Sequence, residues 1–329
     1  ITPELMARIK ELTYADLAAV PVPGGRRHLD LLDAYAAHLH ALVDLSGMRR
    51  LKVVVDAGNG MAGYTTPAVL GPLNVDVIGL FTDLDGSFPN HPPNPLEPAN
   101  LVDAQDAVRA NAADLALVFD GDADRCFIID ERGEVVSPSA ITALIAKAEL
   151  AREPGGVIVV NTITSRAVGE VVEAAGGRLA ISPVGHTRMK AVMAAENAIF
   201  GGEHSAHYYF RDFWRADTGM LAALHVLALL GRAESMSALV AGLPAYAASG
   251  ELNTAVADPS AVMHEVGEAL AGRGSASWDD GLLVSGDDWW VSVRESNTEP
   301  LLRLNVEARD EATMAALRDQ ALAIIRRDA

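Results

Sequence analysis

Leu115-Ala116-Leu117-Val118-Phe119, followed at once by Asp120-Gly121-Asp122-Ala123-Asp124-Arg125, is the stretch that decides the fold. The five apolar residues predict a buried strand, because a short apolar run bounded by turn residues is typical of strands covered on both faces. The acidic run then falls at the carboxyl end of that strand, where open α/β sheets bind their ligands. We therefore expect an α/β protein with a functional loop at this strand end.

The acidic loop itself predicts a metal site. Asp120, Asp122 and Asp124 place three carboxylates at every second position, and such groups repel one another unless a cation lies among them. Mg²⁺ suits clustered oxygen ligands. Arg125 adds a guanidinium that can pair with a phosphate beside the metal.

Other interpretations of the loop remain open at this point. A solvated acidic turn needs no metal. In a calcium-binding EF-hand, Glu131 would supply the twelfth loop position, but Arg125 stands where that loop requires glycine and a strand precedes it. A phosphatase of the haloacid-dehalogenase type would use Asp120 as its nucleophile, although that pattern has Thr or Val where this chain has Asp124.

The rest of the chain alternates strand and helix patterns, and the alternation restarts once. The segments expected in the two blocks are strands at 51–56, 75–81, 115–119, 157–161 and 178–182, and helices at 29–43, 101–111, 166–175, 187–196 and 220–230. This order is typical of α/β domains. Beyond residue 250 we expect a strand, a helix, two or three strands and a final helix at 310–327, which indicates a small α+β domain.

Composition excludes some classes of function. The chain has 329 residues and a formal net charge of -18, which disfavours a nucleic-acid partner. It has no apolar run long enough to span a membrane. The single cysteine, Cys126, fits a reducing cytoplasm, so we expect a cytoplasmic protein. The chain begins with Ile1, and we expect it to start partway through a longer one.

Three further loops carry candidate site residues. Gly201–His207 combines a carboxylate, a hydroxyl and two imidazoles, which can hydrogen-bond sugar hydroxyls. Arg294–Pro300 lies between two strand patterns and offers a guanidinium, hydroxyls and turn amides to a phosphate. Gly185–Lys190 opens a helix, whose free N–H groups favour an anion; His186 is a candidate substrate contact, and Arg188 and Lys190 are compatible with simple solvation. Each of these loops is also compatible with an ordinary polar turn, and Asp56–Gly60 is first of all a tight turn.

The ordered set Asp120–Arg125, Gly202–His207 and Arg294–Pro300 resembles the α-D-phosphohexomutase superfamily, especially its phosphomannomutase/phosphoglucomutase branch. The resemblance runs from about Leu29 to Ala329. It implies two related three-layer α/β domains with mixed sheets plus a C-terminal α+β domain. The family's first domain carries a phosphoserine in a loop reading roughly Thr-Ala-Ser-His-Asn-Pro, and no such run occurs in this sequence.

The resemblance implies four domains around a cleft, of which this chain would supply the last three. The boundaries we expect are 1–27 for a remnant of the first domain and a linker, 28–138 for the domain with the metal loop, 139–249 for the domain with the sugar-binding loop, and 250–329 for the domain with the phosphate-binding loop.

The resemblance also implies roles for individual residues. Asp120, Asp122 and Asp124 match Mg²⁺ ligands, and Arg125 would contact the transferring phosphate. Other matches are catalytic imidazoles at His186 and His207, sugar contacts at Glu203 and Ser205, and a phosphate clamp at Arg294, Ser296, Asn297 and Thr298. Ala206 replaces a glycine usual in the family, which puts the loop conformation there in doubt.

The implied activity is reversible phosphate transfer between the 1- and 6-hydroxyls of mannose or glucose, through a phosphoserine and a hexose 1,6-bisphosphate, in a monomer or weak dimer. The 329 residues alone are expected to be inactive without the serine. The alternatives are a phosphoglucosamine mutase, a non-catalytic sugar-phosphate binding protein, and a Mg²⁺-dependent phosphatase.

Overall fold

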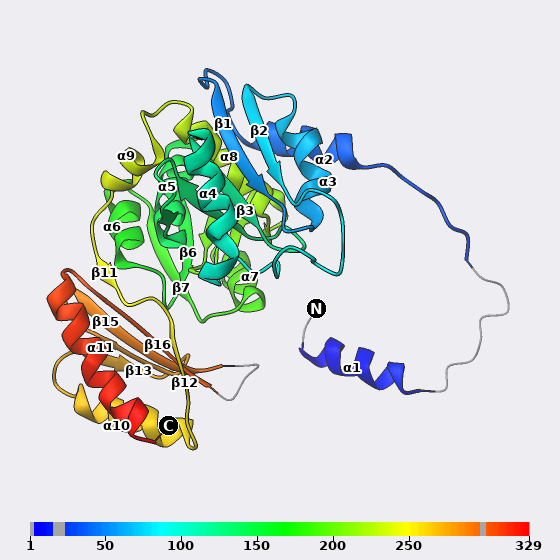
Figure 1. Cartoon of the computed structure of the whole chain (residues 1–329). Helices are drawn as coiled ribbons and strands as arrows, with labels where there is room; N and C mark the ends of the chain where they lie inside the picture. The colour runs from blue at the N-terminus through cyan, green and yellow to red at the C-terminus, as the bar shows by residue number, and fades with distance from the viewer. Residues whose placement is uncertain (1–2, 16–23, 297–300, 329) are drawn as a thin grey trace.

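The computed structural model describes residues 3–15, 24–296 and 301–328. These residues form three β-sheets with helices packed against them, and Figure 1 shows the third sheet set apart from the first two. Helix α1 (Pro3–Thr13) lies away from the sheets, with Leu5 and Met6 half exposed. Among the described residues, no helix is long and apolar enough to pass through a membrane.

The first sheet is built around the strand that the sequence predicted. Its strands are β1 (Leu51–Asp56), β2 (Val75–Leu80), β3 (Leu115–Phe119), β4 (Cys126–Asp130) and β5 (Val135–Val136), in the order β2-β1-β3-β4-β5. The first three are parallel, and β4 and β5 continue the sheet antiparallel, so the sheet is mixed. The helical segments of this block are α2 (Leu32–Leu42), α3 (Met61–Leu70), η1 (Pro98–Leu101) and α4 (Val102–Asn111).

The second sheet repeats the strand order of the first. Its strands are β6 (Val157–Asn161), β7 (Arg178–Ser182), β8 (Phe200–Gly202), β9 (Tyr208–Phe210) and β10 (Ala216–Asp217), in the order β7-β6-β8-β9-β10. Again the first three strands are parallel and the last two antiparallel. The helical segments are α5 (Pro138–Arg152), α6 (Arg166–Ala174), α7 (His186–Ala195), η2 (Arg211–Phe213), α8 (Gly219–Leu230) and α9 (Met236–Ala241).

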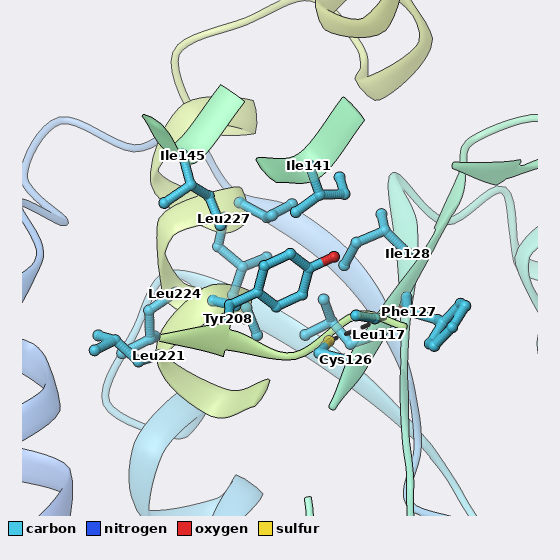
Figure 2. Packing of buried hydrophobic residues seen from close by; sticks show 14 of the residues in the cluster. Leu117, Cys126, Phe127, Ile128, Ile141, Ile145, Tyr208, Leu221, Leu224 and Leu227 are labelled. Atoms are coloured by element: carbon cyan, nitrogen blue, oxygen red, sulfur yellow. Dashed lines mark hydrogen bonds between the residues drawn. The ribbon is translucent and has the colours of Figure 1, made fainter. Parts of the chain in front are cut away.

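One continuous hydrophobic core joins the two mixed sheets. Strands of the first sheet, α5, α8 and the ring of Tyr208 all contribute to it. Figure 2 shows Tyr208 between Ile141 of α5 and Leu224 of α8, with Ile128 of β4 beside it. Cys126 is also buried here, and burial raises the pKa of its thiol. The cysteine therefore contributes to the packing of this core.

The third sheet is antiparallel throughout and has its own core. Its elements are β11 (Ala247–Ala248), β12 (Leu252–Ala255), α10 (Pro259–Ala269), β13 (Ser275–Ser277), β14 (Leu282–Ser285), β15 (Trp289–Glu295), β16 (Leu301–Ala308), α11 (Glu311–Ile325) and η3 (Arg326–Asp328). Four strands follow α10, whereas the sequence predicted two or three. The predicted fold class, two α/β units with mixed sheets and a C-terminal α+β unit, is confirmed.

Candidate active site

The acidic loop follows β3 at the carboxyl edge of the first sheet, and its three carboxylates converge. Asp120, Asp122 and Asp124 each offer an oxygen within 4.8 Å of the others. Burial, and then the charges of Asp120 and Asp122, raise the pKa of Asp124 to about 7. Within the described part of the chain, Asp124 Oδ1 is buried without a hydrogen-bond partner. Such concentrated negative charge fits a bound divalent cation with oxygen ligands.

Arg125 closes the loop on itself. Its backbone N–H donates to Asp120 Oδ1 at 3.1 Å, and its Nε donates to Asp120 Oδ2 at 2.7 Å. The same Nε lies 3.8 Å from Asp124 Oδ1. One guanidinium edge is thus used to orient the carboxylates, while its side chain remains 20% exposed. A guanidinium held in this way can meet a phosphate without first having to be ordered.

The EF-hand interpretation is wrong for this loop. Strands β3 and β4 flank it as an antiparallel hairpin, so no helix enters or leaves. The proposed twelfth ligand, Glu131, accepts the backbone N–H of Ser237 at 3.2 Å and also bonds the Ser237 hydroxyl, so it does not belong to the aspartate cluster.

The turn at 57–60 supports the acidic loop. The Met61 N–H donates to Gly121 O at 2.9 Å. A Cβ on Gly60 would lie 2.5 Å from that same oxygen, so only glycine allows the two loops to approach this closely. The tight turn after β1 therefore has the structural role expected for it.

The loop between β8 and β9 brings Glu203 into a dense hydrogen-bond network. Glu203 Oε1 accepts from Asn161 Nδ2 and from the Gly185 N–H, both at 3.2 Å, and Oε2 accepts from the Tyr209 hydroxyl at 2.6 Å. Glu203 is only 2% exposed. Burial and the neighbouring Glu203 carboxylate raise the pKa of Tyr209, so its hydroxyl stays a donor. Through the hydrogen bond from the Gly185 N–H, Glu203 connects the turn before α7 to the loop between β8 and β9.

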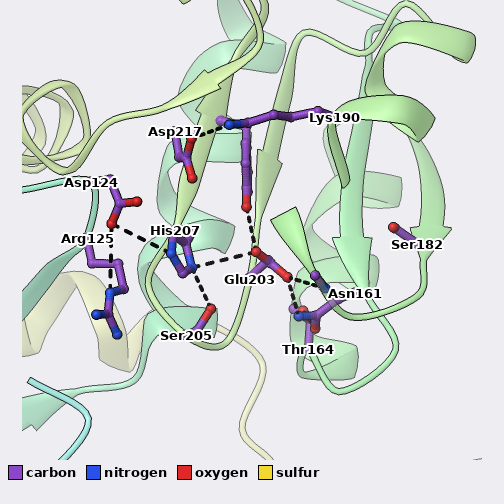
Figure 3. Close-up of polar contacts among 12 residues, drawn as sticks. Asp124, Arg125, Asn161, Thr164, Ser182, Lys190, Glu203, Ser205, His207 and Asp217 are labelled. Atoms are coloured by element: carbon purple, nitrogen blue, oxygen red, sulfur yellow. Dashed lines mark hydrogen bonds and ion pairs between the residues drawn. The ribbon is translucent and has the colours of Figure 1, made fainter. Parts of the chain in front are cut away.

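His207 connects this loop to the acidic loop, as Figure 3 shows. Its Nδ1 lies 2.8 Å from Ser205 Oγ, and its Nε2 lies 3.7 Å from Asp124 Oδ1. A backbone bridge pairs Arg125 with His207 directly. Burial lowers the pKa of His207, which favours the neutral ring. Ala206, whose identity put this loop in doubt, has a φ of 66°, the left-handed conformation that a glycine adopts more readily.

The residues at the start of α7 are not simply solvated. His186 begins the helix and is exposed. Lys190 Nζ lies 2.7 Å from Asp217 Oδ1, which is an ion pair next to His207 in Figure 3. Arg188 Nη1 lies 3.3 Å from Asp280 Oδ1, in the turn between β13 and β14. The possibility that both cations are only solvated is therefore wrong.

The phosphate-clamp candidates lie on the hairpin of β15 and β16. Arg294 is the penultimate residue of β15 and is 8% exposed; burial lowers its pKa. Its Nη2 lies 3.2 Å from Glu251 Oε2. Ser296 follows the strand, and its hydroxyl accepts from Arg303 Nη2 at 3.0 Å. Asn297 and Thr298, the other two predicted clamp residues, lie outside the described residues.

Several residues around these loops were missed by sequence reasoning. The residues are Asn161, Tyr209, Asp217, Glu251, Asp280 and Arg303. Most meet their partners only through long-range folding, so no local pattern marks them. Arg303 is an exception, because it lies opposite Arg294 in the antiparallel pair of β15 and β16. Counting residues outward from the predicted turn on both strands could have shown that these two arginines are neighbours.

Comparisons with known proteins agree with one another on the family. Sequence models of the phosphoglucomutase/phosphomannomutase family match residues 33–133 (alpha/beta/alpha domain II), 137–246 (alpha/beta/alpha domain III) and 251–324 (C-terminal domain). A phosphomannomutase from Salmonella montevideo is 40% identical over 303 residues, which are 90% of this chain and 66% of that protein. The phosphohexose mutases of Xanthomonas campestris pv. campestris reach 39% identity over 95% of this chain and 70% of theirs.

A solved structure gives the same result. The phosphoglucomutase/phosphomannomutase family protein from Burkholderia thailandensis superimposes with a TM-score of 0.82 at 32% identity, over 91% of this chain and 66% of that one. The chain thus spans about two thirds of the length of the curated relatives that it matches.

Proposed function

The chain belongs to the phosphoglucomutase/phosphomannomutase family, and from that membership we propose that it is the greater part of a phosphohexomutase. The reaction is reversible phosphate transfer between the 1- and 6-hydroxyls of a hexose, through a hexose 1,6-bisphosphate and a phosphoserine. The serine belongs to a domain that precedes the three matched ones in the family. The units we propose are 28–138, 139–249 and 250–329; they follow the three sheets except that β11 of the third sheet precedes residue 250.

The observation that carries the proposal is the bridge between Arg125 and His207. It places a carboxylate cluster, a guanidinium and an imidazole in one small region, although they come from two different sheets. Phosphoryl transfer depends chiefly on positioning and on charge neutralisation, and these groups supply both.

The roles follow from the contacts. Asp120, Asp122 and Asp124 would hold Mg²⁺, which when bound neutralises charge on the transferring phosphate. Arg125 would bind another oxygen of the transferring phosphate. His207, kept neutral by burial and bonded to Ser205, can accept a proton from a sugar hydroxyl. His186, exposed at the start of α7, would line the same cleft.

Sugar and phosphate are held by the two other loops in this proposal. Ser205 would hydrogen-bond a sugar hydroxyl, and Glu203 would do so with the lone pairs that its three internal donors leave free. Arg294 and Ser296 would clamp the phosphate that is not being transferred, together with Asn297 and Thr298. The opposed Arg303 extends this clamp, because it already donates to Ser296.

The phosphatase alternative is less well supported by the geometry. Its nucleophile would be Asp120, but both Asp120 oxygens accept hydrogen bonds from Arg125. These hydrogen bonds stabilise the carboxylate and so lower its nucleophilicity. Phosphoglucosamine mutase and sugar-phosphate binding without turnover use the same loops, and an assay across substrates separates them.

The test uses the intact gene product phosphorylated on serine. We expect Mg²⁺-dependent conversion of mannose 1-phosphate or glucose 1-phosphate to the 6-phosphate, with Arg294→Met raising the KM strongly. Inactivity on both sugars, with activity on glucosamine phosphate, would favour the amino-sugar enzyme. Binding without turnover on any of these sugars, or steady release of inorganic phosphate, would contradict a mutase.

A further inference from the structure

A carboxylate occupies the space between the two arginines of the C-terminal hairpin. Glu251 Oε2 lies 3.2 Å from Arg294 Nη2, and Glu251 Oε1 lies 2.9 Å from Arg303 Nη1. Each oxygen thus serves a different guanidinium. The Glu251 side chain is 28% exposed, while that of Arg294 is 10% exposed, so the carboxylate covers the arginine from the solvent side.

Strand register explains why an anion is needed at this point. Arg294 and Arg303 are directly opposite in the antiparallel pair of β15 and β16, so their side chains leave the same face of the sheet. Two guanidiniums in that arrangement repel each other unless negative charge lies between them. A bound phosphate can meet this need, and so can a carboxylate of the protein.

The contacts of Arg303 place Glu251 at the clamp. Arg303, which donates to Glu251, also donates to the Ser296 hydroxyl, the neighbouring clamp residue. The negative charge of Glu251 also acts on the ring of His204 in the β8–β9 loop, next to Glu203. Glu251 therefore lies at the clamp itself, on the guanidinium groups that a phosphate would have to meet.

We propose that Glu251 is a stand-in for the phosphate: it neutralises Arg294 and Arg303 in the free protein, and the phosphate of the substrate displaces it. This inference rests on the proposed function, because it takes the clamp to be a phosphate site. The Glu251 carboxylate lowers the positive charge that the two guanidinium groups present, so they attract a phosphate less than they would without it. The clamp consequently binds phosphate weakly enough to release it. The proposed reaction requires this release, because the bisphosphate intermediate must reorient so that its two phosphates exchange places.

The experiment measures phosphate affinity by calorimetric titration of the protein with inorganic phosphate and with glucose 6-phosphate. Replacing Glu251→Gln keeps the shape of the side chain but removes its charge. We expect binding that is about two- to fivefold tighter, the range of a partly exposed ion pair expressed as an affinity ratio. Affinity for glucose without phosphate should not change.

Glu295→Gln is the matched control. Glu295 is the next residue after Arg294 on the same strand, is exposed, and points away from the clamp in the alternating strand pattern. It removes the same charge from the same hairpin. If both variants tighten binding equally, general electrostatics is responsible and the inference is wrong.

The sign of the effect separates displacement from a purely orienting role. If Glu251 only held the arginines in place, Glu251→Gln and Glu251→Ala would bind phosphate more weakly, and that result would overturn the inference. Should the variants fold poorly, a structure of the wild-type protein with phosphate bound decides, since the carboxylate must have left Arg294. A wild-type protein that binds neither ligand would overturn the proposed clamp itself, whereas unchanged affinity in Glu251→Gln overturns only the displacement.

Discussion

At the scale of single residues, the acidic loop shows how charge is concentrated before any ligand is present. Asp124 has its pKa raised to about 7 by burial and by two neighbouring carboxylates, while Arg125 compensates chiefly Asp120. The loop therefore stores unfavourable electrostatic free energy that a cation can relieve. The spacing of the aspartates in the sequence does not show how strong this repulsion is, whereas their burial in the structure does.

Magnesium should stabilise the protein through these residues. A ligand at about a hundred times its Kd adds about 2.7 kcal/mol to the free energy of unfolding. We expect Mg²⁺ to raise the Tm of the wild-type protein and of Glu131→Gln, but not of Asp122→Asn or Asp124→Asn. Differential scanning fluorimetry measures this. A Tm response lost in Glu131→Gln and retained in Asp124→Asn would contradict the assignment.

The ion pair of Lys190 with Asp217 is a second residue-scale feature. The Asp217 side chain is 9% exposed, and Lys190 Nζ contacts it at 2.7 Å. Lys190→Met should lower the free energy of unfolding by about 1–3 kcal/mol, because it leaves a buried acceptor unpaired. Adding Asp217→Asn should recover part of the loss in urea unfolding. Lys147→Met, on an exposed α5 position, is the control; a coupling energy of zero would mean that the pair is incidental.

At the scale of elements, the buried contact of α8 with α5 carries a pH dependence. His225 of α8 stacks on Phe210 and lies 3.8 Å from Glu149 of α5. Burial, and then the charge of Arg152, lower its pKa to about 3. The unfolded chain binds the proton below pH 6.5 and the folded chain does not, so stability falls as pH drops from 6.5 toward 3.

His225→Phe should remove this dependence while retaining the ring stacking. Between pH 6.5 and 4.5 the wild-type protein should lose roughly 2–3 kcal/mol more stability than the variant, measured by urea unfolding at each pH. Glu149 and Arg152, the charged groups that face the ring, are present in both proteins. If the free energies of unfolding of the wild-type protein and of His225→Phe fell equally with pH, His225 would not be the source of the pH dependence.

Elements with strong periodicity were predictable, and those held by tertiary contacts were not. The strands β1, β3, β6 and β7 have the bounds expected from their apolar runs. Helix α3 was not predicted, since it contains Gly63 and Pro67, which are poor helix formers. Gly63 fits there because a Cβ would lie 2.0 Å from Thr82 O, a contact that no local pattern reveals.

The candidate site likewise contains residues that could be predicted from the sequence and residues that could not. The aspartates, Glu203, His207 and Arg294 stand in short motifs that sequence can mark. The carboxylates of Glu251 and Asp280 meet cations that are 43 and 92 residues away, so only the fold brings them together.

At the scale of the whole molecule, Asp280 fastens the third sheet to the second. Its Oδ2 accepts the Val184 N–H at 2.8 Å and the Thr162 hydroxyl at 3.4 Å, beside the turn that leads into α7. Asp280→Ala should expose the Val184 amide, so hydrogen exchange of the 180–190 segment should become faster. Asp279→Ala is the control, because the Asp279 side chain bonds Ser277 of its own turn among the described residues. Equal exchange in both variants would mean that the contact does not fasten the units.

The separate hydrophobic cores have a consequence for how the molecule melts. The largest core runs through both mixed sheets, a small cluster lies between α7 and the second sheet, and the C-terminal sheet has its own core. A protein whose large cores are separate need not unfold in a single cooperative step. Scanning calorimetry should therefore resolve two heat-absorption peaks, with Leu117→Ala lowering the temperature of one and Leu304→Ala that of the other. A hexose phosphate that touches both units would draw the peaks together, which makes thermal cooperativity a measure of closure around the substrate.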